Sequence, residues 1–162
     1  MVGTASEGKD IKIILFRVNE QLLGMKISYV REVLEYQEPT PVPDSPSWIA
    51  GVLDVGDRII PVASLHCCLY GEEDSSGEGH LLSVKVDERE IAFTTDIVTA
   101  IKTVGSEQVT LPTDITADIH ESLIEGIIRL DGRVAMLINP ENAVDSTIMQ
   151  EVMQATGEGR SA

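Results

Sequence analysis

The sequence predicts a mainly β protein built from two similar halves, and three observations support this. Residues 14–33 align with residues 82–101 at an offset of 68, with apolar positions on apolar positions. Residues 51–63 align with residues 126–138 at an offset of 75, and a glycine and an arginine coincide. Apolar residues also alternate in short runs separated by turn residues, which is typical of hairpins. Since two repeats are too few for an open solenoid, we expect a pseudo-symmetric pair and call its members the first copy and the second copy.

The first copy opens with a hairpin. Residues 1–10 are polar, and we expect them to form a flexible tail. Residues 11–27 alternate on both sides of a turn, which predicts two antiparallel strands. Residues 27–34 carry apolar side chains at a spacing of three and four, and Ser28 is a suitable cap. This pattern predicts a turn or two of helix.

A crossover and a second hairpin complete the first copy. Four prolines within residues 39–48 exclude a central strand or a long helix there. The second hairpin covers residues 52–65 and has Gly56 and Asp57 at its tip. Residues 71–79 are rich in glycine and acidic residues, so we expect an exposed loop between the copies.

The second copy repeats this order with a longer middle. Its opening hairpin covers residues 81–93, and its crossover covers residues 106–123. The last hairpin has Asp131 and Gly132 at its turn, a strong signal for a type I′ turn. An apolar stripe then predicts a C-terminal helix over residues 146–156.

Short strands that are apolar on one face cannot bury that face alone. Closing them into a small barrel removes the open edges and fills the interior. We therefore predict one domain over residues 11–145 that contains two barrels, the first at about residues 14–70 and the second at about 81–140. Two barrels side by side would leave a groove between them.

The composition excludes several classes of partner. The formal net charge is −15, from 27 acidic and 12 basic residues, and such a field repels nucleic acid and anionic membranes. No apolar run reaches the roughly 18 residues that a membrane helix needs. The two cysteines, Cys67 and Cys68, are adjacent, so a disulfide framework is absent and a cytoplasmic location is expected.

Residues 43–51 (PDSPSWIAG) and the following residues 51–65 (GVLDVGDRIIPVASL) resemble the CheW family of chemotaxis coupling proteins. The resemblance extends over about residues 13–144. It implies a pair of intertwined five-stranded barrels of the Src-homology-3 type, with no catalytic activity and no cofactor. It also implies a scaffold that couples chemoreceptor signalling tips to the regulatory domain of a CheA-type histidine kinase.

The resemblance further suggests where partners bind. The receptor-binding groove that it implies contains Val33, Asp54, Val55, Gly56, Asp57 and Arg58. The apolar residues that we single out as partner contacts are Val30, Leu34 and Trp48, with packing in the core as the alternative for each of them.

The binding motif departs from the family pattern at its centre. Gly56 stands where the family has an arginine, and glycine cannot imitate a planar group with five donors. The sequence leaves open whether Arg58, two residues further on, takes its place. Asp54 and Asp57 at the tip favour a basic partner surface over an acidic one. A second interpretation is therefore an adaptor of a type IV pilus or other non-flagellar pathway, which binds the kinase and not the usual receptors.

A ligand-binding or metal-binding barrel is the remaining interpretation, and only His66, Cys67 and Cys68 support it. Neither a C-x-x-C nor an H-x-x-x-H spacing is present, and neighbours on a strand point to opposite faces. We therefore predict no metal site and no catalytic residues. Gly51 and Gly126, which recur at one position of both copies, predict a close approach of backbone at a barrel corner.

Overall fold

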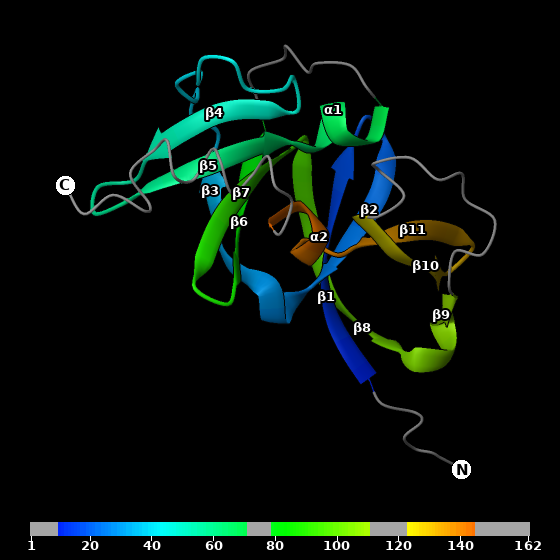
Figure 1. Cartoon of the computed structure of the whole chain (residues 1–162). Coiled ribbons are helices and arrows are strands. Elements are labelled where there is room, and N and C mark those ends of the chain that lie inside the picture. Colours follow the sequence, from blue (N-terminus) through cyan, green and yellow to red (C-terminus); the bar gives the residue numbers. More distant parts are fainter. Residues whose placement is uncertain (1–9, 71–78, 111–122, 145–162) are drawn as a thin grey trace.

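The computed structural model describes residues 10–70, 79–110 and 123–144, which form two β-sheets with short helical turns (Figure 1). The strands are β1 (Asp10–Val18), β2 (Gln21–Lys26), β3 (Val30–Glu35), β4 (Ile49–Asp54), β5 (Ile59–Ser64), β6 (His80–Val86), β7 (Arg89–Thr95), β8 (Ile97–Gly105), β9 (Val109–Thr110), β10 (Ile124–Leu130) and β11 (Arg133–Ile138). The helical elements are the 3-10 turns η1 (Ile27–Tyr29) and η2 (Ser106–Gln108) and the short helices α1 (Leu65–Tyr70) and α2 (Glu141–Val144). The prediction of a mainly β fold is confirmed. The predicted helix at 146–156 lies outside the described residues.

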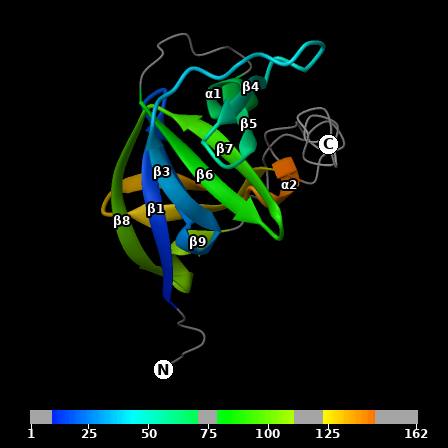
Figure 2. The same ribbon diagram turned by 90° about the vertical axis from the view of Figure 1, so that its left-hand side faces the viewer.

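Each sheet takes strands from both copies. The strand order is β8-β1-β2-β11-β10-β9 in the first sheet and β3-β6-β7-β5-β4 in the second sheet. The third strand of the first copy, β3, lies beside β6 of the second copy, with Val33 opposite Leu82 (Figure 2). In the same way β8 of the second copy pairs with β1, where Ile101 lies opposite Ile14. The two copies are therefore interleaved and form one folding unit.

This exchange corrects the predicted division of the chain into barrels at residues 14–70 and 81–140. The second sheet contains β3, β4 and β5 together with β6 and β7, so neither sheet corresponds to a continuous half of the sequence. A sequence repeat identifies which strands are equivalent. It does not say which copy supplies the neighbour of each strand, because the pairing depends on where the chain goes after the first hairpin.

The repeat nevertheless predicts the local register correctly. Phe16 faces Leu23 in the hairpin of β1 and β2, and the equivalent Val84 faces Ile91 in the hairpin of β6 and β7. The second hairpins, β4–β5 and β10–β11, each contain a bulge at the equivalent glycine. The first sheet has six strands instead of five because the two-residue strand β9 pairs with β10.

The two equivalent glycines lie where the crossover touches the second hairpin. A Cβ atom on Gly51 would overlap the carbonyl group of Thr40, and one on Gly126 would lie 2.8 Å from the side chain of Val109. Gly51 also has a φ of 147°, in the region that side chains disfavour. The predicted close approach of backbone is confirmed at Gly51, and at Gly126 the close neighbour is a side chain.

The segment at residues 27–34 differs from its prediction. Only Ile27–Tyr29 is helical, as a single 3-10 turn, and the chain continues as strand β3. Val30 and Val33 are β-branched, and β3 forms an antiparallel ladder with β6. The ladder hydrogen bonds outweigh the helical spacing of so short a segment.

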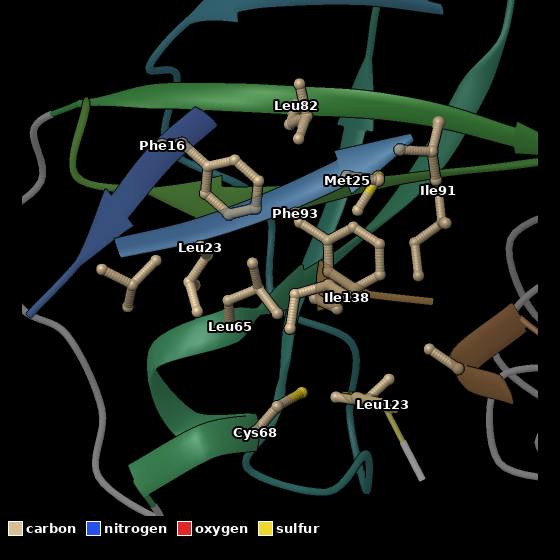
Figure 3. Close-up of a cluster of buried hydrophobic side chains, with 14 of the residues drawn as sticks. Phe16, Leu23, Met25, Leu65, Cys68, Leu82, Ile91, Phe93, Leu123 and Ile138 are labelled. Atoms are coloured by element: carbon tan, nitrogen blue, oxygen red, sulfur yellow. The ribbon is translucent and has the colours of Figure 1, made fainter. Parts of the chain in front are cut away.

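The core consists of three clusters of buried side chains. The central cluster joins the two sheets, with Phe16, Leu23, Leu82 and Phe93 at its middle (Figure 3). The first-sheet cluster contains Ile13, Leu15, Leu22, Val104, Ile128, Leu130, Ala135 and Leu137. The second-sheet cluster contains Leu53, Ile60, Val62, Leu81 and Ala92. Because each of the last two comes from one sheet only, each sheet curls around its own interior like a small barrel.

Candidate functional site

The hairpin tip between β4 and β5 carries most of the predicted groove residues. The carboxylate of Asp54 accepts a hydrogen bond from the backbone N–H of Gly56 at 2.9 Å, and the N–H of Val55 donates to the carbonyl of Arg58 at 3.0 Å. Gly56 has a φ of 106°, which glycine adopts without strain. The shape of this turn therefore disfavours an arginine, or any other residue with a side chain, at position 56.

Arg58 is held by carboxylates on three sides. Its Nε and Nη2 atoms donate to the two carboxylate oxygens of Glu90 at 2.6 and 3.0 Å, a bidentate pair. Its Nη1 donates to Asp57 at 2.8 Å, and its Nη2 also lies 3.3 Å from a carboxylate oxygen of Glu32. These contacts raise the pKa of Arg58, chiefly through Glu90. The guanidinium is therefore engaged within the protein, and it occupies a different place from an arginine projecting at the tip.

Glu90 is the centre of this charged network. Its side chain is only 9% exposed, and it accepts a hydrogen bond from the hydroxyl of Ser83 at 2.5 Å. Arg31 lies 3.6 Å away and adds a second positive charge. Burial alone raises the pKa of Glu90, but the hydrogen bonds from Arg58 and Ser83 outweigh it and hold the pKa below its ordinary value. The carboxylate is thus ionised and fully paired at neutral pH.

The network covers one end of the second-sheet cluster. Glu90 lies two residues before Ala92 on β7, and Ser83 lies two residues after Leu81 on β6, so both point to the interior face of the sheet. We call the set Arg31, Glu32, Asp57, Arg58, Ser83 and Glu90 the charged end. Sequence reasoning found Asp57 and Arg58 and missed the other members. The sequence does contain a signal for this network, because Glu90 is a charged residue at the position where the first copy has the apolar Leu22.

The remaining predicted residues separate into exposed and buried ones. Val33 is 41% exposed on β3, and Asp57 has a side chain that is 77% exposed. Val30 packs against the central cluster and Leu34 against the second-sheet cluster, and both are partly buried. Trp48 is buried in the central cluster. The structure therefore confirms the alternative of core packing that the sequence offered for Trp48.

The cysteine pair lies in a helix and not at a strand end. His66, Cys67 and Cys68 belong to α1, and both cysteines are buried. Burial raises the pKa of the Cys68 thiol to about 12, which disfavours the thiolate that a metal ligand or a nucleophile requires. Within residues 10–70, 79–110 and 123–144, no three histidine, cysteine or acidic side chains lie close enough to hold a metal ion.

No helix in the described part of the chain is long and apolar enough to cross a bilayer. The fold and the site together define a class of protein, namely a β protein of two paired barrels, one of which carries the charged end. Its distinguishing features are two sheets that each take strands from both copies, two hairpins with a bulge beside a glycine, and the motif at residues 51–65.

The chain belongs to the CheW-like domain family, whose model matches residues 12–147. It is 26% identical over 136 residues to the chemotaxis protein CheW of Rhizobium meliloti, covering 83% of this chain and 88% of that protein. It is 24% identical over 143 residues to CheW of Thermotoga maritima, covering 88% of this chain and 93% of that protein. The crystal structure of the scaffolding protein TtCheW from Thermoanaerobacter tengcongensis superposes with a TM-score of 0.72 at 25% identity, covering 81% and 90% of the two chains. The predicted family is confirmed, and a chemotaxis adaptor or scaffold is the function that this membership supports.

Proposed function

We propose that this chain is a non-enzymatic adaptor that couples chemoreceptor signalling tips to the regulatory domain of a CheA-type histidine kinase. The observation that carries the proposal is the match of the family model over residues 12–147, together with the interleaved two-sheet fold. Such an adaptor acts by holding two partners at fixed positions, so its chemistry is that of surfaces. A cytoplasmic location remains a prediction.

The receptor site that we propose is the β4–β5 tip with the neighbouring part of β3. Val33 offers an exposed apolar side chain that can serve as an anchor, and a few such anchors carry most of the affinity of an interface. Asp57 and Glu32 have side chains 77% and 42% exposed, whereas the positive head of Arg58 is turned to Glu90. We therefore expect this surface to select a partner with basic residues at its rim.

The binding test uses the purified full chain, the regulatory domain of its cognate kinase and a soluble fragment of the receptor tip. We expect both to bind in isothermal titration calorimetry, without any catalytic turnover by the chain. Val33→Glu is expected to weaken receptor binding at least tenfold, because it places a charge where an apolar anchor docks. The matched control is Val134→Glu, which changes another exposed valine, on β11. Binding to neither partner would overturn the proposal.

A second candidate function follows from the departure at Gly56. In an adaptor of a type IV pilus or other non-flagellar pathway, the kinase would bind and the usual receptors would not. The quadruple variant Asp54→Asn, Val55→Leu, Gly56→Arg and Asp57→Gly restores the family motif. A gain of receptor binding in this variant, with kinase binding unchanged, supports the second candidate, and unchanged receptor binding argues against it.

A further inference from the structure

The proline-rich crossover between β3 and β4 borders a cleft of about 430 Å³. It lies at the opposite end of the second sheet from the charged end, because Tyr36 follows the last residue of β3 and Ser64 is the last residue of β5. The cleft is within the size range of roughly 300–1,000 Å³ that is usual for binding sites, and barrel mouths are a common place for them. None of the residues that line it belongs to the proposed receptor site.

The walls of the cleft are fixed before any partner arrives. Pro39, Pro41 and Pro46 line it, and each has a φ angle locked by its ring. Thr40 and Val52 exchange two backbone hydrogen bonds of 2.8 Å, which tie the crossover to β4. A preformed site loses less conformational entropy when it binds, so a small cleft of this kind can still give useful affinity.

The serine hydroxyls of the cleft are engaged in hydrogen bonds within the protein, whereas the carboxylate of Glu38 can bind a partner. The hydroxyl of Ser45 donates to the carbonyl of Val42 at 2.7 Å, and the hydroxyl of Ser64 accepts a hydrogen bond from the N–H of Cys67 at 3.0 Å. Glu38 lines the cleft and is exposed, and within the described ranges it forms no hydrogen bond or ion pair. The cleft thus combines the rings and methyl groups of its prolines, Ile49 and Ala50 with several polar groups, and the carboxylate of Glu38 has no cation partner among the described residues.

This combination selects a side chain with an apolar stem and a positive head. Arginine and lysine have such side chains, and their methylene groups pack well on apolar surfaces. Tyr36 also lines the cleft, and aromatic residues attract cations. The formal net charge of −15 attracts basic partners from a distance. We propose that the cleft is a socket for an arginine side chain that a partner protein inserts beside Glu38, a binding site separate from the receptor site.

The test is a ¹⁵N NMR titration of the full chain with the peptide acetyl-Gly-Ser-Arg-Ser-Gly-amide. We expect saturable shifts in the amide signals of Tyr36, Ser47 and Ala50, with an affinity at least three times that of the same peptide carrying norleucine. Glu38→Gln is expected to lower the affinity at least threefold. Glu35→Gln is the matched control, since Glu35 is an exposed carboxylate on β3 that does not line the cleft.

Three results would overturn the inference. The first is the absence of saturable shifts at these amides, and the second is equal binding of the arginine and norleucine peptides. The third is binding of agmatine, a free small cation, without binding of the peptide, because it would make the cleft a small-molecule site. None of these experiments uses a kinase or a receptor, so their outcome is independent of the proposed function.

Discussion

The two equivalent hairpin tips of this chain are each followed by an arginine, but the residues that lie next to these arginines in the folded protein differ. Arg58 follows the tip of β4–β5, and Arg133 occupies the equivalent position in β10–β11. Arg58 pairs with Glu90 above the second-sheet cluster. In the first sheet the position equivalent to Glu90 is Leu22, which is buried in the first-sheet cluster. The exposed side chain of Arg133 forms no hydrogen bond or ion pair in the described part of the chain.

The comparison shows that one barrel end is filled by apolar side chains, whereas the equivalent end of the other barrel is closed by a network of ion pairs and hydrogen bonds. The equivalents of Ser83 and Glu90 in the first sheet are Leu15 and Leu22, so that end is filled by apolar packing. Burying a leucine contributes about 1.5–3 kcal/mol and depends little on pH or salt. A buried ion pair contributes less net stability, but it fixes the positions of charged groups. The charged end is therefore suited to holding a binding surface in place, and the apolar end to stability.

The largest expected effect on stability comes from placing a carboxylate, like that of Glu90, at the equivalent position of the apolar barrel end. Leu22→Glu removes a buried leucine from the first-sheet cluster and puts a carboxylate there without a serine donor beside it. We expect a loss of about 3–5 kcal/mol in the free energy of unfolding in urea, from lost burial and an unpaired charge. Glu20→Gln, at an exposed turn position of the same hairpin, serves as the control. A change below about 1 kcal/mol would mean that the first sheet has no closed interior at this point.

The next effect distinguishes the two arginines. Arg58→Ala leaves Glu90 with Arg31 and Ser83 only, and we expect a cost of about 2 kcal/mol, less than for a fully buried pair because Arg58 is partly exposed. Arg133→Ala is expected to stay within about 0.5 kcal/mol of the parent chain, as is usual for surface positions. Both values come from chemical denaturation, and equal costs would remove the distinction between the ends.

The charged end should also give the protein an acid-sensitive part of its stability. The pKa of Glu90 is lowered in the folded state, so this carboxylate stabilises the fold above the ordinary glutamate pKa of 4.5. That contribution is lost as the pH falls below 4.5 through the folded-state value, because the unfolded chain then binds more protons. Glu90→Gln is expected to be less stable than the parent chain by about 1–2 kcal/mol at pH 6, and the difference is expected to shrink as the pH falls below 4.5. Glu88→Gln, at an exposed position in the neighbouring turn, is the matched control variant for these measurements.

The smallest effect concerns the hydroxyl of Ser83. Ser83→Ala removes one hydrogen bond to Glu90 and leaves the arginine contacts in place. We expect a loss of about 1 kcal/mol, the usual value for one hydrogen bond, because Arg58 and Arg31 keep the Glu90 carboxylate paired. Thermal unfolding compared with Ser106→Ala, an exposed serine in η2, measures the difference. No difference would show that Glu90 depends on the arginines alone.

The sequence predicts which strands of the two copies are equivalent, but it does not predict which strands pair with each other between the copies. Hairpin registers follow from alternation, since a shift of one residue would turn Phe16 and Val84 away from the core. The recurrence of Gly51 and Gly126 likewise reflects a local contact that each copy must make. The exchange of β3 and β8 between sheets has no local signal, because either copy offers a suitable apolar strand as neighbour.

The candidate site is predictable only in part for a similar reason. The tip residues follow from a local motif, and the structure places Asp54, Gly56 and Asp57 at an exposed tip as expected. The role of Arg58 depends on Glu90, which lies 32 residues further along and on another strand. Trp48 was ambiguous because a tryptophan serves equally well as a core residue or as an anchor, and only the tertiary packing decides.

One comparison of binding tests most directly whether the first-copy tip, and not its equivalent, meets the partner. Asp57→Lys and Asp131→Lys reverse one exposed charge at each hairpin tip. Affinity for the receptor-tip fragment, measured by isothermal titration calorimetry, should fall at least fivefold for Asp57→Lys and stay within twofold for Asp131→Lys. Equal effects of the two substitutions, or an effect at Asp131 alone, would contradict the account.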